Sequence, residues 1–187
     1  ITHSHLDHIL GIAGLISTYL RWEAMDKVEI YAGQNALERI DDLLTRVVIR
    51  GAHPPFPIEM ILIEPGIFIE EQDFTIEAFP VNHRGSDCYG FNFRERGRRP
   101  FLADKAEALG IPQGPWRRDL AQGKPTALPD GRVIQPEEVL GEFERGTLLS
   151  LVGDSGETGS LLPYCKGADG LVIEATYLAQ EQEMAHQ

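Results

Sequence analysis

Apolar residues recur along the chain with two different spacings, which predict two kinds of element. In residues 9–22 and 34–50 they fall three and four positions apart, the spacing of one helix face. Shorter runs rich in Ile, Val and Phe, with turn residues such as Pro65 and Gly66 between them, predict strands. These strands are expected at residues 28–32, 58–63, 67–69, 74–81, 89–93, 147–152 and 171–173.

Both patterns fade between residues 94 and 131. Glycine, proline and charged residues rise there, and the helical stretch near residues 101–109 is short. A long, weakly patterned segment inside a compact domain is usually functional or disordered. Beyond it, short helices are expected at 161–166 and from 177 to 187. Strands alternating with helices favour a layered α/β fold, so we expect an α/β domain over 1–187 with 94–131 as an insert.

Composition narrows the class of protein. The chain has 187 residues, 42% of them hydrophobic and 25% charged, as in a soluble globular domain, and it contains no apolar run of membrane-spanning length. Two cysteines, Cys88 and Cys165, do not make a disulfide framework, which favours a reducing compartment. Because the chain starts inside a motif and stops inside a helical pattern, we expect it to be truncated at both ends.

The first eight residues contain the pattern H-x-H-x-D-H. Its members are His3, His5, Asp7 and His8. Imidazole and carboxylate groups are ligands that zinc accepts, and one zinc uses three or four protein ligands. Four such groups in six positions, with further ones elsewhere in the chain, therefore predict two metal ions.

Three further polar side chains follow strand-like runs. They are His83, Asp154 and Glu174. Loops at the ends of strands are where α/β folds collect functional groups, so these residues are candidates to complete the site.

Charge is distributed unevenly along the chain. The net charge is −12, which argues against a surface that coats nucleic acid generally. Residues 94–124 nevertheless hold eight basic and four acidic residues, a net charge of +4. This basic stretch is either a local phosphate-contacting surface or a solvated loop with chance charge.

Together these motifs resemble the metallo-β-lactamase superfamily. H-x-H-x-D-H at 3–8, the isolated His83, G-D-S at 153–155 and E-A-T at 174–176 stand in the order of that superfamily. Within it, the segments 108–115, 128–134 and 136–140 resemble the arm of the ribonuclease Z family, with Gly114 and Pro115 between two basic clusters. The resemblance implies a metallo-β-lactamase fold, an αββα sandwich, with an inserted flexible arm.

The resemblance also implies a reaction. Ribonuclease Z is a zinc-dependent endoribonuclease that removes the 3′ trailer of precursor tRNA by hydroxide attack on a phosphodiester and leaves a tRNA 3′-hydroxyl. One zinc would be held by His3, His5 and His83, and a second by Asp7, His8 and a histidine beyond residue 187, with Asp154 bridging both. Mn²⁺ or Fe²⁺ could replace zinc, because imidazole accepts all three.

Roles for single residues follow from the same resemblance. Asp7 is the expected general base, and Glu174 is expected to orient a catalytic histidine or, alternatively, to cap the following helix. The residues expected to contact tRNA are Gly114, Pro115, Arg117 and Arg118. Trp116 could stack on RNA or pack inside the arm. A homodimer in the cytoplasm, with precursor tRNA as partner and no membrane, is also expected.

Two other functions remain open at this point. The metal residues alone fit a small-molecule hydrolase of the same superfamily, such as a phosphodiesterase, sulfatase or lactonase, although a long basic insert argues against it. A non-catalytic RNA-binding protein with an incomplete site belongs to another class, and the intact ligand set argues against it.

Overall fold

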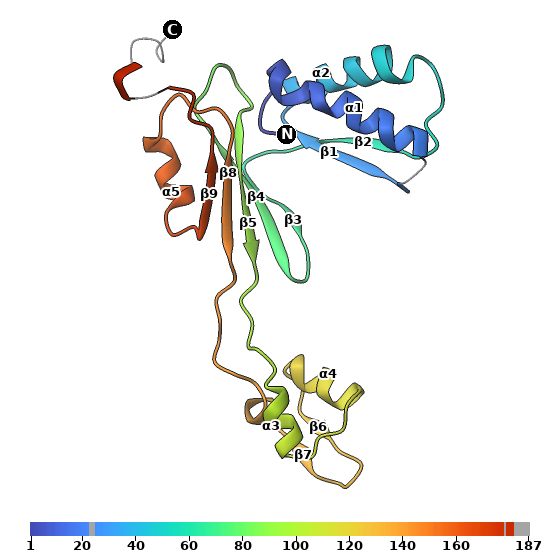
Figure 1. Cartoon of the computed structure of the whole chain (residues 1–187), viewed down its shortest axis with the longest axis vertical. Coiled ribbons are helices and arrows are strands. Elements are labelled where there is room, and N and C mark those ends of the chain that lie inside the picture. The colour runs from blue at the N-terminus through green and yellow to red at the C-terminus, as the bar shows by residue number, and fades with distance from the viewer. Residues whose placement is uncertain (23–24, 178, 182–187) are drawn as a thin grey trace. The chain divides into compact units, whose positions relative to one another are not determined.

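The computed structural model describes residues 1–22, 25–177 and 179–181. The chain divides into two compact units (Figure 1). The first, here called the body, comprises Ile1–Arg94 and Leu148–Gln187, and the second, here called the inserted unit, is Glu95–Thr147. Each unit has its own hydrophobic cluster, so each is described separately.

The first half of the body contains two helices and a pair of parallel strands. Helix α1 (Leu6–Trp22) and helix α2 (Gln34–Asp42), which continues into the π-helical turn η1 (Leu43–Ile49), pack with strands β1 (Val28–Ala32) and β2 (Ile58–Leu62). The helices predicted at 9–22 and 34–50 are confirmed. Helix α1 starts earlier than expected, at Leu6, so Asp7 and His8 belong to its first turn.

The second helical segment ends for a local reason. Arg50 and Gly51 both have positive φ, 50° and 81°, the left-handed conformation that commonly ends a helix. Pro54 and Pro55 follow, and proline cannot continue a helix because it lacks the amide hydrogen.

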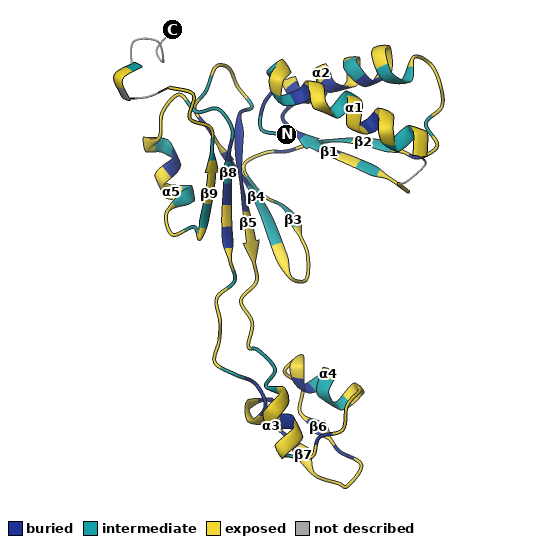
Figure 2. Cartoon of the chain, viewed as in Figure 1, coloured by how far each residue is buried: buried dark blue, intermediate teal, exposed yellow. Residues whose placement is uncertain are grey.

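The body also contains a mixed five-stranded sheet with the order β3-β4-β5-β8-β9. Its strands are β3 (Gly66–Glu70), β4 (Phe74–Pro80), β5 (Tyr89–Glu95), β8 (Leu148–Val152) and β9 (Gly170–Ile173). Strand β8 pairs antiparallel with β5 and parallel with β9, and the buried positions of β5 and β8 lie at the centre of the sheet (Figure 2). All the strands predicted for this sheet are confirmed, with bounds shifted by one or two residues.

A short helical connection links β8 to β9. It consists of η3 (Gly159–Leu161) and α5 (Leu162–Cys165). The ring of Tyr164 stacks on the buried Phe79, with ring centroids 4.8 Å apart, which holds this connection against the sheet. Because the connection packs on the sheet, it fixes the loop that follows β8, and that loop contains Asp154.

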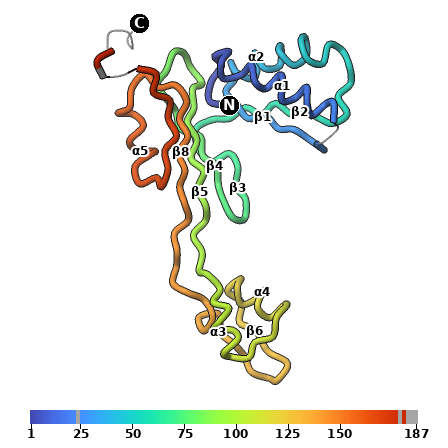
Figure 3. Tube along the Cα trace, in the orientation of Figure 1, coloured from blue at the N-terminus to red at the C-terminus, as the bar shows by residue number. Residues whose placement is uncertain are grey.

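The inserted unit leaves the sheet at the end of β5 and returns at β8 (Figure 3). It contains α3 (Ala103–Ala108), α4 (Pro115–Ala121), β6 (Thr126–Ala127), β7 (Val133–Ile134) and the turn η2 (Pro136–Glu138). It is more ordered than its sequence pattern indicated. Its core is formed by Ala106, Ile111, Leu120, Leu128, Ile134 and Val139. Since half of these residues follow Gly123, the compact unit extends beyond 94–131, to Thr147.

The α/β class predicted from the sequence is confirmed. None of the helices within the described residues is long and apolar enough to cross a membrane. The helix predicted from 177 to 187 falls mostly outside the described residues, of which Ala179–Glu181 form the short turn η4.

Candidate metal centre

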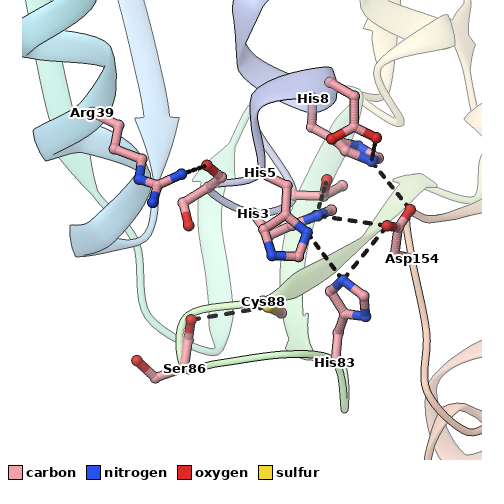
Figure 4. A network of polar contacts seen from close by, with 11 residues as sticks. His3, His5, His8, Arg39, His83, Ser86, Cys88 and Asp154 are labelled. Carbon is pink, nitrogen blue, oxygen red and sulfur yellow. Dashed lines mark hydrogen bonds and ion pairs between the residues drawn. The ribbon is translucent and has the colours of Figure 1, made fainter. Parts of the chain in front are cut away.

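Six polar side chains from three segments of the body lie close together (Figure 4). His3 and His5 precede α1, and Asp7 and His8 lie in its first turn. His83 lies in the connection between β4 and β5, and Asp154 follows β8 by two residues. The loops that follow β4 and β8 therefore bring His83 and Asp154 to the same edge of the sheet, as expected for functional groups at the ends of strands.

Asp154 is the centre of this cluster. Its Oδ1 lies 3.1 Å from Nε2 of His8, and its Oδ2 lies 3.5 Å from Nε2 of His83 and 3.8 Å from Nε2 of His3. Nε2 of His83 is also 3.3 Å from Nδ1 of His5. The two carboxylate oxygens thus face different sets of imidazoles.

The ligand atoms form two groups that share Asp154. The larger group consists of His3, His5, His83 and Asp154, and the smaller one of Asp7, His8 and Asp154. The ligand atoms within each group all lie within 4.8 Å of one another. The six residues proposed from the sequence as metal ligands are therefore brought together.

The chemistry of the donors fits a metal ion. Nε2 of His3 is buried and has no hydrogen-bond partner within the described residues, a costly arrangement unless another group binds it. Burial, followed by the nearby His8, lowers the pKa of His3 to about 4, and burial also lowers the pKa of His83. Neutral imidazole is the form that binds metal, so His3 and His83 are ready to bind at neutral pH. The cluster of histidine and aspartate could therefore hold metal ions.

Backbone contacts hold the three loops together. The amide of Tyr89 donates to the carbonyl of Thr2 at 2.8 Å, and the amide of Gly156 donates to the carbonyl of Asn82 at 2.7 Å. A Cβ on Gly153 would lie only 2.9 Å from Oγ1 of Thr2, so this position needs glycine for the close approach. The first contact ties the His3 loop to β5, and the second ties the Asp154 loop to the His83 loop.

An open pocket of about 470 Å³ adjoins the cluster. Its lining includes His5, His83, Asp154, Ser155, Glu174 and Tyr177. Glu174 follows β9 and lies at this pocket, but it belongs to neither ligand group among the described residues. Its role toward a histidine therefore stays a prediction.

Sequence reasoning missed Arg84, which also lines this pocket. Among the described lining residues, it supplies the one permanent positive charge. Its position directly after His83 could have indicated this, because the neighbour of a metal ligand in a loop can line the same pocket as the ligand. A guanidinium suits a phosphate, which it can bind through two parallel hydrogen bonds.

The residues expected to contact tRNA lie around the start of α4 in the inserted unit. Gly114 precedes the helix with φ 114°, and Pro115 opens it. Arg118 is exposed, whereas Arg117 donates from Nε and Nη2 to the carbonyl of Ile111, at 3.0 and 2.8 Å. Trp116 packs against the core of the inserted unit, which supports the packing alternative.

These features define the class of protein, an α/β protein with a cluster of histidine and aspartate, at the ends of its strands, that could hold metal ions. The relatives are more specific. The chain is 42% identical over 185 residues to ribonuclease Z of Bradyrhizobium diazoefficiens, covering 99% of this chain and 61% of that protein. Ribonuclease Z of Gemmatimonas aurantiaca is 32% identical over 99% of this chain and 60% of its own length.

The resemblance to ribonuclease Z is therefore confirmed along the whole chain, which spans about three fifths of the length of these relatives. No family model matches the sequence. A crystal structure of a new diphosphatase from the PhnP family is 23% identical with a TM-score of 0.39, covering 50% of this chain and 34% of that one. A likeness this slight assigns neither substrate nor reaction.

Proposed function

We propose that the protein of which this chain is a part is a zinc-dependent endoribonuclease that removes the 3′ trailer from precursor tRNA. The observation that carries the proposal is the pair of ligand groups joined at Asp154, in a chain similar throughout to ribonuclease Z. A centre built in this way suits hydrolysis of a phosphodiester, since two metals can stabilise both the attacking and the leaving oxygen.

The ligand residues would divide between two zinc ions. His3, His5 and His83 would hold one, and Asp7 and His8 would hold the other with a histidine beyond residue 187. Asp154 would bridge them, because its two oxygens face different histidines. Bound zinc lowers the pKa of a water to about 7, which supplies hydroxide at neutral pH. Mn²⁺ and Fe²⁺ suit the same donors.

Asp7 would act as the general base. Its side chain is 78% exposed and lies beside His8, with Oδ2 of Asp7 at 3.5 Å from Nε2 of His8. An exposed carboxylate at the edge of the cluster can reach substrate and accept a proton. Glu174, at the rim of the pocket, would orient a catalytic histidine beyond residue 187, a supporting contact of the kind that metal sites use.

Arg84 would bind a phosphate of the RNA within the pocket. The inserted unit would bind tRNA away from the cleaved bond, through Gly114, Pro115 and Arg118 on its surface. Arg117, whose guanidinium is already bonded to Ile111, would contribute by holding α4 in the position that presents these residues. Recognition of folded RNA by shape and phosphate contacts suits such a surface.

A homodimer in the cytoplasm completes the proposal. Large apolar side chains are exposed on α1 and η1, among them Leu6 (56%), Leu10 (52%), Trp22 (73%) and Val47 (62%). A second copy is the occupant we propose for this face. Light scattering on the full-length protein should give a dimer, and Leu10→Glu should give a monomer. A monomeric parent would contradict this part of the proposal.

The central experiment is cleavage of a 3′-extended precursor tRNA by the full-length protein with zinc, beside Asp7→Asn. We expect a single cut at the 3′ end of the tRNA, and a loss of about 10²–10⁴-fold in kcat in the variant. Metal content and the cut position are measured in parallel, because a variant that has lost metal says nothing about the base.

Other outcomes would redirect the proposal. Hydrolysis of bis(p-nitrophenyl) phosphate without any cut in tRNA would favour the small-molecule hydrolase. Binding of tRNA without hydrolysis of either substrate would favour a non-catalytic RNA-binding protein. Normal cleavage by Asp7→Asn with normal metal content would show that Asp7 is not the general base.

A further inference from the structure

Helix α2 contacts both of the loops that carry the histidines of the larger ligand group. Near its C-terminal end, Nη1 of Arg39 donates to the carbonyl of Ser4 at 3.0 Å (Figure 4). Ser4 lies between His3 and His5, so this bond fixes the backbone that joins the two ligands.

The first turn of the same helix contacts the loop that carries His83. The amide of Asn35 donates to Oδ2 of Asp87 at 3.4 Å, and Nδ2 of Asn35 donates to Oγ of Ser86 at 3.2 Å. Gly33, at the N-cap of α2, has no side chain to accept a hydrogen bond from the helix. The Asp87 carboxylate, which is 52 residues away in sequence, takes that place and puts a negative charge at the positive end of the helix.

The loop is shaped to reach the helix closely. A Cβ on Gly33 would lie 2.4 Å from Cβ of Asp87 and 3.1 Å from its carbonyl oxygen, so glycine is required there. Asp87 itself has φ 62°, the left-handed region that few residues other than glycine, Asn and Asp adopt. A strained backbone persists only where its surroundings hold it, and here the contact with α2 does so.

Such support matters because holding the three imidazoles close together without a metal ion costs free energy. The ring centroids of His3, His5 and His83 lie 4.6 to 5.0 Å apart. Three rings this close repel one another when protonated, and when neutral they turn nitrogen lone pairs toward a common point. A scaffold that holds the loops in place before metal binds reduces the cost of bringing the ligands together.

We propose that α2 positions the larger ligand group, with Arg39 holding the His3–His5 loop and Asp87 holding the His83 loop against one rigid helix. Arg39 and Asp87 are positioning residues, because neither belongs to a ligand group among the described residues. The inference rests on the metal centre proposed above. It adds that the affinity of this centre depends on a helix that supplies no ligand.

The test is titration of the metal-free, full-length protein with Co²⁺, measuring the apparent Kd and the visible absorption spectrum. Arg39→Met removes the hydrogen-bond donors and keeps an unbranched apolar stem. We expect Co²⁺ binding to weaken by about 10–100-fold, as for other groups that support metal ligands, and the spectrum to change. Arg39→Lys keeps a positively charged donor group and should recover most of the affinity.

Arg46→Met is the matched control. Arg46 lines the same open surface as Arg39, beside Leu6 and Leu10, but its ion pair is with Asp42 at 2.8 Å, on the helix itself. It should bind Co²⁺ as the parent does. Asp87→Asn, which tolerates the left-handed backbone and keeps an oxygen acceptor, should bind more tightly than Asp87→Gly, which frees the backbone but loses the cap.

The outcomes separate this inference from the metal centre itself. If the parent binds no Co²⁺, or binds it unchanged after His83→Ala, the metal centre is wrong. If the parent binds but Arg39→Met matches Arg46→Met, the metal centre stands and the positioning role is wrong. Thermal unfolding in chelator provides the fold control. The positioning role would also be wrong if Arg39→Met lowered the unfolding midpoint together with the Co²⁺ affinity and Arg39→Lys did not restore the affinity.

Discussion

The metal cluster and the inserted unit are built in opposite ways. The cluster gathers side chains from residue 3 to residue 154, so its geometry depends on contacts between distant parts of the chain. The inserted unit takes its core from Ala106 to Val139, within one continuous stretch of chain. The candidate reacting groups therefore need the whole body to place them, whereas the surface proposed to bind RNA can fold as a local unit.

The two regions also differ in charge. Residues 95–147 contain nine basic and nine acidic residues, so the inserted unit is neutral and the body carries the net charge of −12. A body of that charge repels an RNA backbone. Seven of the nine basic residues of the inserted unit lie between Arg96 and Lys124, so this stretch is the part of the unit that attracts phosphate most strongly.

The largest expected effect comes from the residue on which the cluster depends. Asp154→Asn replaces one carboxylate oxygen by an amide nitrogen that does not bind metal, while the two original oxygens face different histidines. We expect both ligand groups to lose metal and hydrolysis of precursor tRNA and of bis(p-nitrophenyl) phosphate to fall together to background. Metal analysis and the two assays measure this.

The control for Asp154→Asn is thermal unfolding in chelator, where the variant should match the metal-free parent. Retention of a full metal complement would mean that Asp154 does not join the two groups. Loss of activity on tRNA alone would move Asp154 from metal binding to RNA binding.

A smaller effect is expected when the inserted unit is removed and the body is kept. The amide of Glu95 donates to the carbonyl of Thr147 at 2.9 Å, so the two ends of the unit already lie side by side as strands do. Replacing residues 96–146 by Asn-Gly should close β5 and β8 into a tight hairpin. We expect KM for precursor tRNA to rise at least about tenfold, the value of one charge-assisted hydrogen bond.

Hydrolysis of bis(p-nitrophenyl) phosphate and Co²⁺ affinity should stay near parental in this deletion, since no ligand residue lies between 96 and 146. Equal losses on both substrates would show that the body needs the inserted unit for its own fold. An unchanged KM would show that tRNA is bound elsewhere.

The sequence could predict the cluster because its residue types have few other uses at that spacing. His3, His5 and His8 within six positions have no role in packing a core that would explain the pattern. The strands of the body could also be predicted from the sequence. The apolar residues that mark β4, β5 and β8 are the ones that pack in the core. Helix α1 begins earlier than predicted because Asp7 and His8 are candidate metal ligands and also belong to the first turn of the helix.

The remainder depends on contacts that no local pattern reveals. Helices α3 and α4 are short, and short helices are stabilised by packing rather than by their own residues. Arg117 and Arg118 are adjacent residues of the same type, yet one is hydrogen-bonded to Ile111 and the other is exposed. The contact between α2 and Asp87 joins residues 52 positions apart, so the local sequence of neither segment predicts it.

The smallest expected effect separates the two adjacent arginines. Arg117 is 17% exposed and bonded through two nitrogens to the carbonyl of Ile111, so Arg117→Met should destabilise the inserted unit by about 1–3 kcal/mol. Arg118→Met should leave stability unchanged, weaken binding of precursor tRNA, and reduce the slope of log affinity against log salt by about one. Denaturant unfolding and salt-dependent tRNA binding measure both.

The two variants serve as controls for each other, because they remove the same side chain from neighbouring positions of one helix. The reverse result, with Arg118→Met destabilising and Arg117→Met changing the salt slope, would mean that Arg117 leaves Ile111 to bind phosphate. A salt slope unchanged in both variants would take α4 out of the RNA-binding surface. In that case, any effect of removing the whole unit would come from its basic residues outside α4, such as those from Arg96 to Lys105.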